Sequence, residues 1–157
     1  MSVSGRSAES LIHPATLALL GGAPVVLESS ARRKPSSGDA PSIRSFRLKY
    51  VAVENLGKFL GESALRLMRI IDANERTAQR RREQGSLTAE ESDRIARIAR
   101  VAQRAADAFG DKVQAREWIK RPNRALQGFV PLGLLSTDAG AALVTDELGR
   151  IEYGDLY

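Results

Sequence analysis

Residues 74–85, NERTAQRRREQG, carry side chains that can hydrogen-bond to DNA. Arginine can bridge O6 and N7 of guanine, and glutamine can bridge N6 and N7 of adenine. Further arginines in the run suit phosphate oxygens, which position a protein on DNA without specifying sequence. An arginine-rich helix is also often only a solvated surface, so both interpretations stay open at this point. The candidate DNA-binding residues are Arg76, Thr77, Gln79, Arg80, Arg81 and Arg82.

A second candidate site lies at the carboxyl end of the sequence, which reads RIEYGDLY over residues 150–157. It combines acidic side chains, two tyrosines and the terminal carboxylate, with Gly154 allowing the chain to turn. Chain ends are usually untethered, so an acidic and aromatic end suits a concave basic pocket on a partner better than it suits the end of a fold. The candidate partner-binding residues are Arg150, Glu152, Tyr153, Gly154, Asp155, Leu156 and Tyr157.

The groups that most enzymes use are missing from the sequence. There is no cysteine, and the single histidine, His13, cannot form a metal cluster alone. No glycine-rich phosphate loop is found, and the adjacent acids Asp146 and Glu147 point in different directions on a helix. We therefore expect no catalytic residue, no metal and no cofactor. A small enzyme that uses carboxylates alone is the alternative.

Composition favours an all-α protein. Of the 157 residues, 43% are hydrophobic and only 5% are aromatic, with alanine, leucine, arginine and glutamate prominent. The net charge of +5 is unevenly distributed, since residues 66–104 hold ten basic and six acidic side chains whereas residues 137–157 hold one and five. This asymmetry suggests a polyanionic partner for one surface and a basic partner for another. The lack of cysteine, and of a run of about 18 apolar residues, favours the cytoplasm and no membrane.

Periodicity and capping signals predict six or seven helices. Residues 1–45 include a Ser/Pro/Gly-rich segment and are predicted to be a flexible arm or linker, although the Leu/Val stretch before that segment could form a short helix or dock on a partner. Predicted helices cover about 53–60, 65–71, 75–84, 89–109, 112–121, 131–135 and 138–151. The most secure of them opens with a Thr88–Glu91 capping box and ends at Gly110.

Two of these helices, joined by a short turn and with a basic second member, are typical of a helix-turn-helix, in which the second helix enters the major groove. The turn departs from the usual glycine followed by an apolar residue, because Asp72 and Ala73 occupy these positions. Asp can take the left-handed conformation at some cost relative to glycine. Four further arginines on the next helix are predicted to meet phosphates: Arg94, Arg97, Arg100 and Arg104.

Residues 109–154 resemble the C-terminal domain of the ParS/MbcA/Xre antitoxins, the partners of RES-domain toxins. The matching features include Phe109-Gly110-Asp111, Trp118, Pro122-Asn123, Pro131-Leu132 and Leu148-Gly149-Arg150-Ile151-Glu152. Residues 76–101 are similar to the Xre-like helix-turn-helix of the same family. The resemblance implies an Xre-like helix-turn-helix region over 46–108 and a small helical toxin-binding domain over 109–157.

For function, the resemblance implies an antitoxin of a type II RES-Xre system. The RES toxin resembles NAD-consuming or ADP-ribosyl-transferring enzymes, and the C-terminal end of the antitoxin is implied to enter its cleft and block NAD. The implied partners are the cognate toxin, a second copy of the chain in a homodimer, and operator DNA. The alternative is a stand-alone helix-turn-helix transcriptional regulator with no toxin partner, which accounts for the basic helix and gives the acidic end no role.

Overall fold

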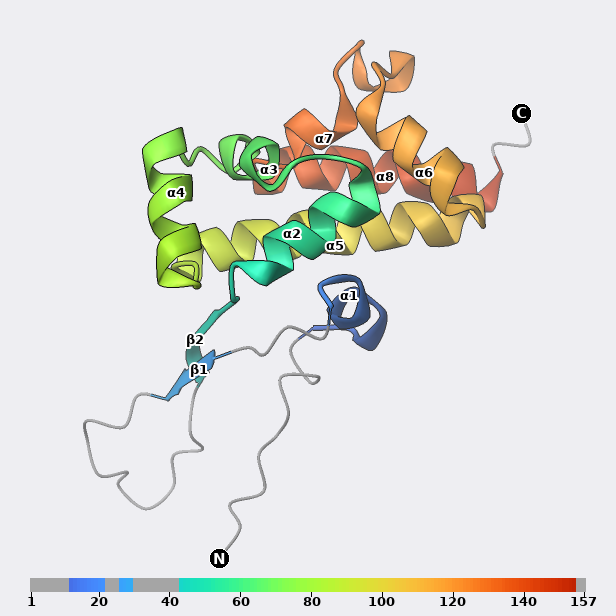
Figure 1. Cartoon of the computed structure of the whole chain (residues 1–157). Coiled ribbons are helices and arrows are strands. Elements are labelled where there is room, and N and C mark those ends of the chain that lie inside the picture. The colour runs from blue at the N-terminus through green and yellow to red at the C-terminus, as the bar shows by residue number, and fades with distance from the viewer. Residues whose placement is uncertain (1–11, 22–25, 30–42, 155–157) are drawn as a thin grey trace, which may run out of the picture.

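The computed structural model describes residues 12–21, 26–29 and 43–154, and within them the fold is all-α apart from one pair of short strands (Figure 1). The elements in chain order are α1 (Pro14–Leu19), β1 (Val26–Ser29), β2 (Ile43–Arg47), α2 (Val51–Leu60), α3 (Ala64–Ile70), α4 (Glu75–Gln84), α5 (Ala89–Phe109), α6 (Lys112–Lys120), the 3-10 helix η2 (Arg124–Leu126), α7 (Pro131–Leu134) and α8 (Asp138–Tyr153).

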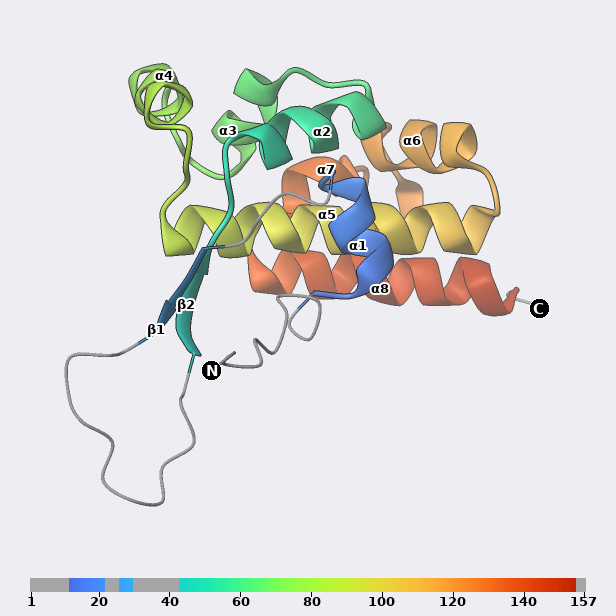
Figure 2. The same ribbon diagram turned by 60° about the horizontal axis from the view of Figure 1, so that its bottom comes forward.

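Helix α5 is the central element, and helices from both halves of the chain pack around it (Figure 2). Its apolar positions recur at helical spacing, so Ile95, Ile98, Ala102 and Ala105 all face the core and are at most 1% exposed. One side of α5 contacts α1 and α2, and α6 and α8 also pack along it. The core is therefore continuous from the α2–α4 region to α8.

The helix boundaries follow from local signals in the sequence. Thr88 and Glu91 form both bonds of the predicted capping box at the start of α5. Asn74 caps α4 by accepting a hydrogen bond from the Thr77 amide at 2.8 Å, and Gly85 ends that helix in the left-handed conformation. These ends agree with the predictions.

Part of the predicted arm packs against the body. Helix α1 lies against α5, with Leu20 fully buried, and the Asn55 side-chain amide donates to the Leu20 carbonyl at 3.1 Å. The short helix that the sequence left undecided is therefore present. Strands β1 and β2 pair in antiparallel fashion. With α1 included, the described residues contain eight α-helices rather than six or seven, and residues 30–42 of the predicted linker lie outside the described part.

Helix α6 fastens the C-terminal half to the end of α2. Arg116 Nε donates to the Phe59 carbonyl at 2.8 Å, and Lys120 Nζ donates to the Gly61 carbonyl at 3.5 Å. The last carbonyls of a helix lack intrahelical partners and carry partial negative charge, so these cations satisfy them. None of the described helices has the length and apolar content required to cross a bilayer.

Candidate functional site

The turn between α3 and α4 has the geometry that a helix-turn-helix needs. Asp72 takes the left-handed conformation with φ 65°, the conformation that the sequence required of it. Ala73, at 7% exposure, fills the apolar position that follows. From α5, Arg94 Nη1 donates to the Ile71 carbonyl at 2.9 Å and lies 3.6 Å from Asp72 Oδ2. The turn therefore forms with Asp72 in place of the usual glycine.

The inner face of α4 is fixed to α5 by an ion pair. Arg81 Nε lies 2.7 Å from Glu91 Oε2, with side-chain exposures of only 14% and 13%. Arg81 Nη1 also donates to the Gln84 side chain at 3.0 Å. The sequence placed Arg81 among the DNA-binding residues, but its guanidinium is turned inward and engaged by this carboxylate. In the structure Arg81 holds α4 in place instead of lying on its outer surface.

The outer face of α4 presents the remaining candidates. Arg76, Arg80 and Arg82 are exposed, and within the described part of the chain Arg76 and Arg80 have no side-chain partner. Thr77 is half-buried. The Gln79 side-chain amide donates to Glu83 at 2.9 Å, so that bond must open before Gln79 can read a base. Arg76 and Arg80 are thus the two arginines best placed to reach nucleic acid.

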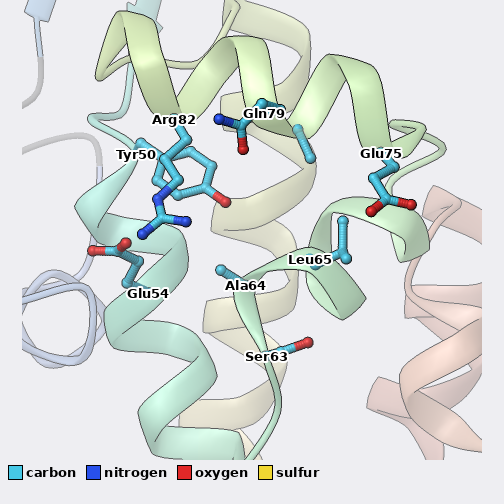
Figure 3. Close-up of a pocket in the computed structure, with 9 residues that line it drawn as sticks. Tyr50, Glu54, Ser63, Ala64, Leu65, Glu75, Gln79 and Arg82 are labelled. Carbon is cyan, nitrogen blue, oxygen red and sulfur yellow. The ribbon is translucent and has the colours of Figure 1, made fainter.

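A groove of about 350 Å³ lies beside this face, between the start of α2, the start of α3 and α4 (Figure 3). At one end Arg82, Tyr50 and Glu54 lie together, and at the other Glu75 leaves α4. Burial raises the pKa of the Tyr50 hydroxyl, the charge of Glu54 raises it further, and Arg82 offsets part of the shift. The hydroxyl stays protonated at neutral pH and can donate a hydrogen bond.

The groove itself is not strongly basic. Its lining holds one arginine, Arg82, and two carboxylates, those of Glu54 beside Arg82 and of Glu75 at the far end. A phosphate in the groove would therefore meet both attraction and repulsion, whereas one on the outer face of α4 would meet Arg76 and Arg80. The outer face is the better candidate surface for nucleic acid.

Most of the arginines on α5 are occupied by the protein itself. Arg94 supports the α3–α4 turn, and Arg97 pairs with Asp138 and donates to the Leu135 and Ser136 carbonyls at 3.4 and 3.3 Å. Arg104 lies 3.4 Å from Glu152. Three of the four arginines predicted to meet phosphates therefore have partners within the protein. Arg100 is exposed and, among the described residues, has no such partner.

The C-terminal candidate residues lie on the last turn of α8 and beyond it. Arg150 pairs with Glu147 of the same helix at 2.9 Å and stays exposed, whereas Glu152 pairs with Arg104 of α5. Tyr153 is 84% exposed, and Gly154 follows with φ 58°. Asp155, Leu156 and Tyr157 lie outside the described residues. Tyr153 is thus the one candidate aromatic ring of this segment within the described residues, and it is open to solvent.

The described residues do not bring three histidine or carboxylate side chains together in a group that could hold a metal ion. The described chain carries a basic helix, α4, at one end and an exposed tyrosine at the end of α8.

Comparison with known families gives two matches. Residues 40–100 match the antitoxin Xre-like helix-turn-helix domain, and residues 104–154 match the antitoxin Xre/MbcA/ParS C-terminal toxin-binding domain. The chain belongs to the Xre/MbcA/ParS antitoxin family. The two matches cover most of the described residues, from β2 to the end of α8.

Relatives of this antitoxin family match about half of the chain. An "Antitoxin Xre" of Photorhabdus laumondii is 49% identical over 71 residues, covering 45% of this chain and 48% of the relative. The "Antitoxin Xre" of Yersinia enterocolitica is 46% identical over 77 residues, covering 48% and 52%. That of Pseudomonas putida is 34% identical over 68 residues, covering 43% of each chain. The chain thus spans about half the length of these curated relatives.

Within the antitoxin fold, sequence reasoning missed the structural roles of Glu91 and of the α5 arginines. The one local signal was the capping box, which marked Glu91 as a partner of Thr88 but not of Arg81. Contacts between helices distant in sequence carry no periodic signal, so they could not be predicted from spacing.

Proposed function

We propose that this protein is an antitoxin that binds and neutralises a cognate RES-domain toxin. The observation that carries the proposal is the end of α8, where Tyr153 projects into solvent within the segment that matches a toxin-binding domain. The relatives are named Antitoxin Xre, which also supports an antitoxin function.

The proposed mode of inhibition is occupation of the toxin's NAD site by residues 152–157. Carboxylates of this segment would pair with the cationic groups that otherwise hold the NAD pyrophosphate, and a tyrosine would fill a ring-binding subsite. Glu152 lies 3.4 Å from Arg104, so this ion pair would open when the Glu152 carboxylate binds a cationic group of the toxin.

Deletion of residues 153–157 tests this mode. The deletion starts at the last helical residue and removes an exposed ring, so thermal unfolding should change little. The toxin's NAD turnover should no longer be inhibited, and co-expressing cells should no longer be protected. The control is Val51→Ala, which trims an exposed apolar side chain, at 42% exposure, on α2 outside residues 109–157. A truncated protein that still inhibits NAD turnover would overturn the plugging mode.

We also propose that α4 binds operator DNA and represses expression of the antitoxin and its toxin. Arg76 and Arg80 on the outer face of α4 support this role. A dimer would read two half-sites about one turn of DNA apart. On this proposal the chain divides into an arm over 1–45, a helix-turn-helix region over 46–108 and a toxin-binding domain over 109–157.

The geometry of the α3–α4 turn fits DNA binding equally well in the alternative, a stand-alone transcriptional regulator. The two functions are separated by co-purification with the product of a neighbouring reading frame, followed by an NAD-consumption assay. A protein that shifts promoter DNA and has no toxin partner would be a regulator alone. A protein that inhibits a toxin and fails to shift any promoter DNA at low salt would lack the regulatory function.

A further inference from the structure

The connection between α6 and α7, residues 121–130, presents an exposed aromatic ring. Phe129 is 58% exposed, although Leu126 before it and Pro131 after it are both buried. A phenylalanine side chain has a large apolar surface and no polar group that could interact with water. We refer to residues 121–130 as the Phe129 loop. It lies between α6 and α7, away from α4 (Figure 1).

Backbone hydrogen bonds hold the Phe129 loop in one conformation. The Asn123 amide donates to the Phe129 carbonyl at 3.0 Å, and the Asn123 carbonyl accepts from the Gly128 amide at 2.8 Å. The Phe129 amide donates to the Leu126 carbonyl at 3.0 Å. The Asn123 side chain caps η2 by accepting from the Ala125 amide at 2.8 Å. Both polar groups of the Phe129 backbone are therefore bonded, which fixes the point from which its side chain projects.

The backbone of Gln127 is strained in this arrangement. Among the described residues other than glycine, only Asp72 and Gln127 have positive φ, at 65° and 56°. The left-handed conformation costs free energy for a residue with a Cβ, and such strain is found most often at functional sites. Asp72 forms the α3–α4 turn. Gln127 is exposed, and its side chain has no hydrogen-bond partner among the described residues, so its conformation acts only on the course of the loop that leads to Phe129.

A groove of about 400 Å³ adjoins the Phe129 loop. Its lining includes Trp118 of α6 and two arginines of the loop, Arg121 and Arg124. Arg121 has an acidic partner on α6 at 3.5 Å. Arg124 is exposed, and no described residue pairs with its guanidinium. The loop thus carries an exposed ring and a free cation beside a half-buried indole, and aromatic and arginine side chains are the types enriched at the centres of protein interfaces.

The location of the loop indicates its partner. The Phe129 loop lies entirely within residues 104–154, which match a toxin-binding domain. We propose that the loop is an anchor for the toxin, in which the Phe129 ring enters an apolar pocket of the toxin and the Arg124 guanidinium pairs with a carboxylate at the edge of that pocket. This inference rests on the antitoxin function proposed above. A second copy of this chain is the other occupant to distinguish.

The Phe129 loop and residues 152–157 have separate roles on this proposal. The loop contributes affinity for the toxin, and the C-terminal segment blocks NAD. Loss of the Phe129 ring therefore weakens binding without preventing inhibition of the toxin molecules that are bound. Loss of the C-terminal segment has the opposite result, because the loop still binds the toxin while its NAD site is open.

Titration calorimetry of the full chain with the co-purifying product of the neighbouring reading frame tests the anchor. Phe129→Ala should raise the dissociation constant at least about tenfold, as expected for a central aromatic contact. Arg124→Glu should raise it about threefold or more, because the introduced glutamate repels the carboxylate. At concentrations above the raised dissociation constants, both variants should still inhibit NAD turnover completely. A variant lacking residues 153–157 should still bind and should not inhibit.

The matched controls are Val51→Ala and Arg66→Glu, which change an exposed apolar side chain on α2 and an exposed arginine on α3 outside residues 104–154. Both should bind the toxin as the unchanged protein does. Circular dichroism checks that each variant folds, and sedimentation velocity compares its oligomeric state with that of the unchanged protein.

The possible failures are distinguishable. If the unchanged protein binds and inhibits the toxin, and Phe129→Ala binds with unchanged affinity, the anchor is wrong and the proposed function stands. If Phe129→Ala changes the oligomeric state and leaves toxin affinity unchanged, the loop contacts a second copy of the chain and the anchor is again wrong. If the unchanged protein does not bind the neighbouring product, the proposed function fails and the anchor fails with it.

Discussion

The guanidinium of Arg81 and the carboxylate of Glu91 meet at 2.7 Å between two largely buried side chains, and through this contact α4 is attached to α5. The same carboxylate accepts a hydrogen bond from the Thr88 amide at 2.9 Å, completing the capping box. Glu91 therefore supports both the start of α5 and the position of the candidate DNA-binding helix.

We expect Glu91→Gln to lower the free energy of unfolding by about 1 to 3 kcal/mol, because a glutamine leaves the Arg81 charge without its counter-ion. Urea or thermal unfolding measures this. Glu90→Gln is the control, since Glu90 is exposed and its pair with Arg94 is of the weak surface type. Equal losses in the two variants would contradict the role given to Glu91.

The contribution of Glu91 should depend on pH. Burial acts to raise its pKa, but the hydrogen bonds from Arg81 and Thr88 and the charge of Arg81 outweigh burial and hold the pKa below its usual range. A lowered folded-state pKa means stabilisation that is fully present above the unfolded-state pKa of about 4.3 and is lost as the pH falls through the folded value. The stability difference between the unchanged protein and Glu91→Gln should be constant near pH 7 and shrink below about pH 4.3. A difference that grows with acid would refute this assignment.

Asp72→Gly should leave the protein as stable or make it more stable, by up to about 1 kcal/mol. Glycine adopts the left-handed conformation without the cost that Asp72 bears at φ 65°, and the ion pair with Arg94 that the glycine variant gives up is long and exposed. Asp72→Val should destabilise by about 1 kcal/mol or more, because a β-branched residue fits this conformation poorly. Thermal unfolding of the pair gives the answer, and a valine variant as stable as the glycine variant would contradict it.

Gly140→Ala should destabilise by about 2 kcal/mol or more. A Cβ at this position would lie 1.9 Å from the Leu134 backbone carbonyl oxygen, so α7 and α8 would have to separate. Gly133→Ala is the matched control, because its Cβ would meet nothing within 4 Å and alanine favours a helix. Chemical denaturation should show a large loss for the first variant and none for the second.

Arg80→Ala should weaken binding to a cognate operator by about 1 to 3 kcal/mol if Arg80 contacts a base edge. Arg81→Ala should instead act through folding, since Arg81 is engaged by Glu91. Fluorescence anisotropy with specific and random duplexes, combined with thermal unfolding, separates the two effects. If Arg81→Ala weakens DNA binding and leaves thermal stability unchanged, Arg81 belongs to the DNA-binding surface.

Helix ends were predictable from the sequence because they depend on local chemistry. Thr88, Asn74 and Gly85 act on backbone groups within a few residues of themselves. The directions of the long arginine side chains were not predictable, because their partners Glu91, Asp138 and Glu152 lie on other turns or other helices. The same reason explains why α1 could be suspected as a helix but not placed against α5.

The C-terminal candidate site was predicted from its composition, and the structure describes its first part, residues 150–154. Tyr153 lies where a partner can reach it, while Arg150 and Glu152 are held in ion pairs. Amino-acid type indicated which residues could bind a partner. It did not indicate which of them form ion pairs within the protein.

The boundary between the two family matches, residues 101–103, falls inside α5 rather than in a loop. Val101 and Ala102 are buried there, in the middle of the helix around which both halves are assembled. A recombination event that joined the 5′ part of one such gene to the 3′ part of another at residues 101–103 would divide α5. Both halves of the chain pack against this helix.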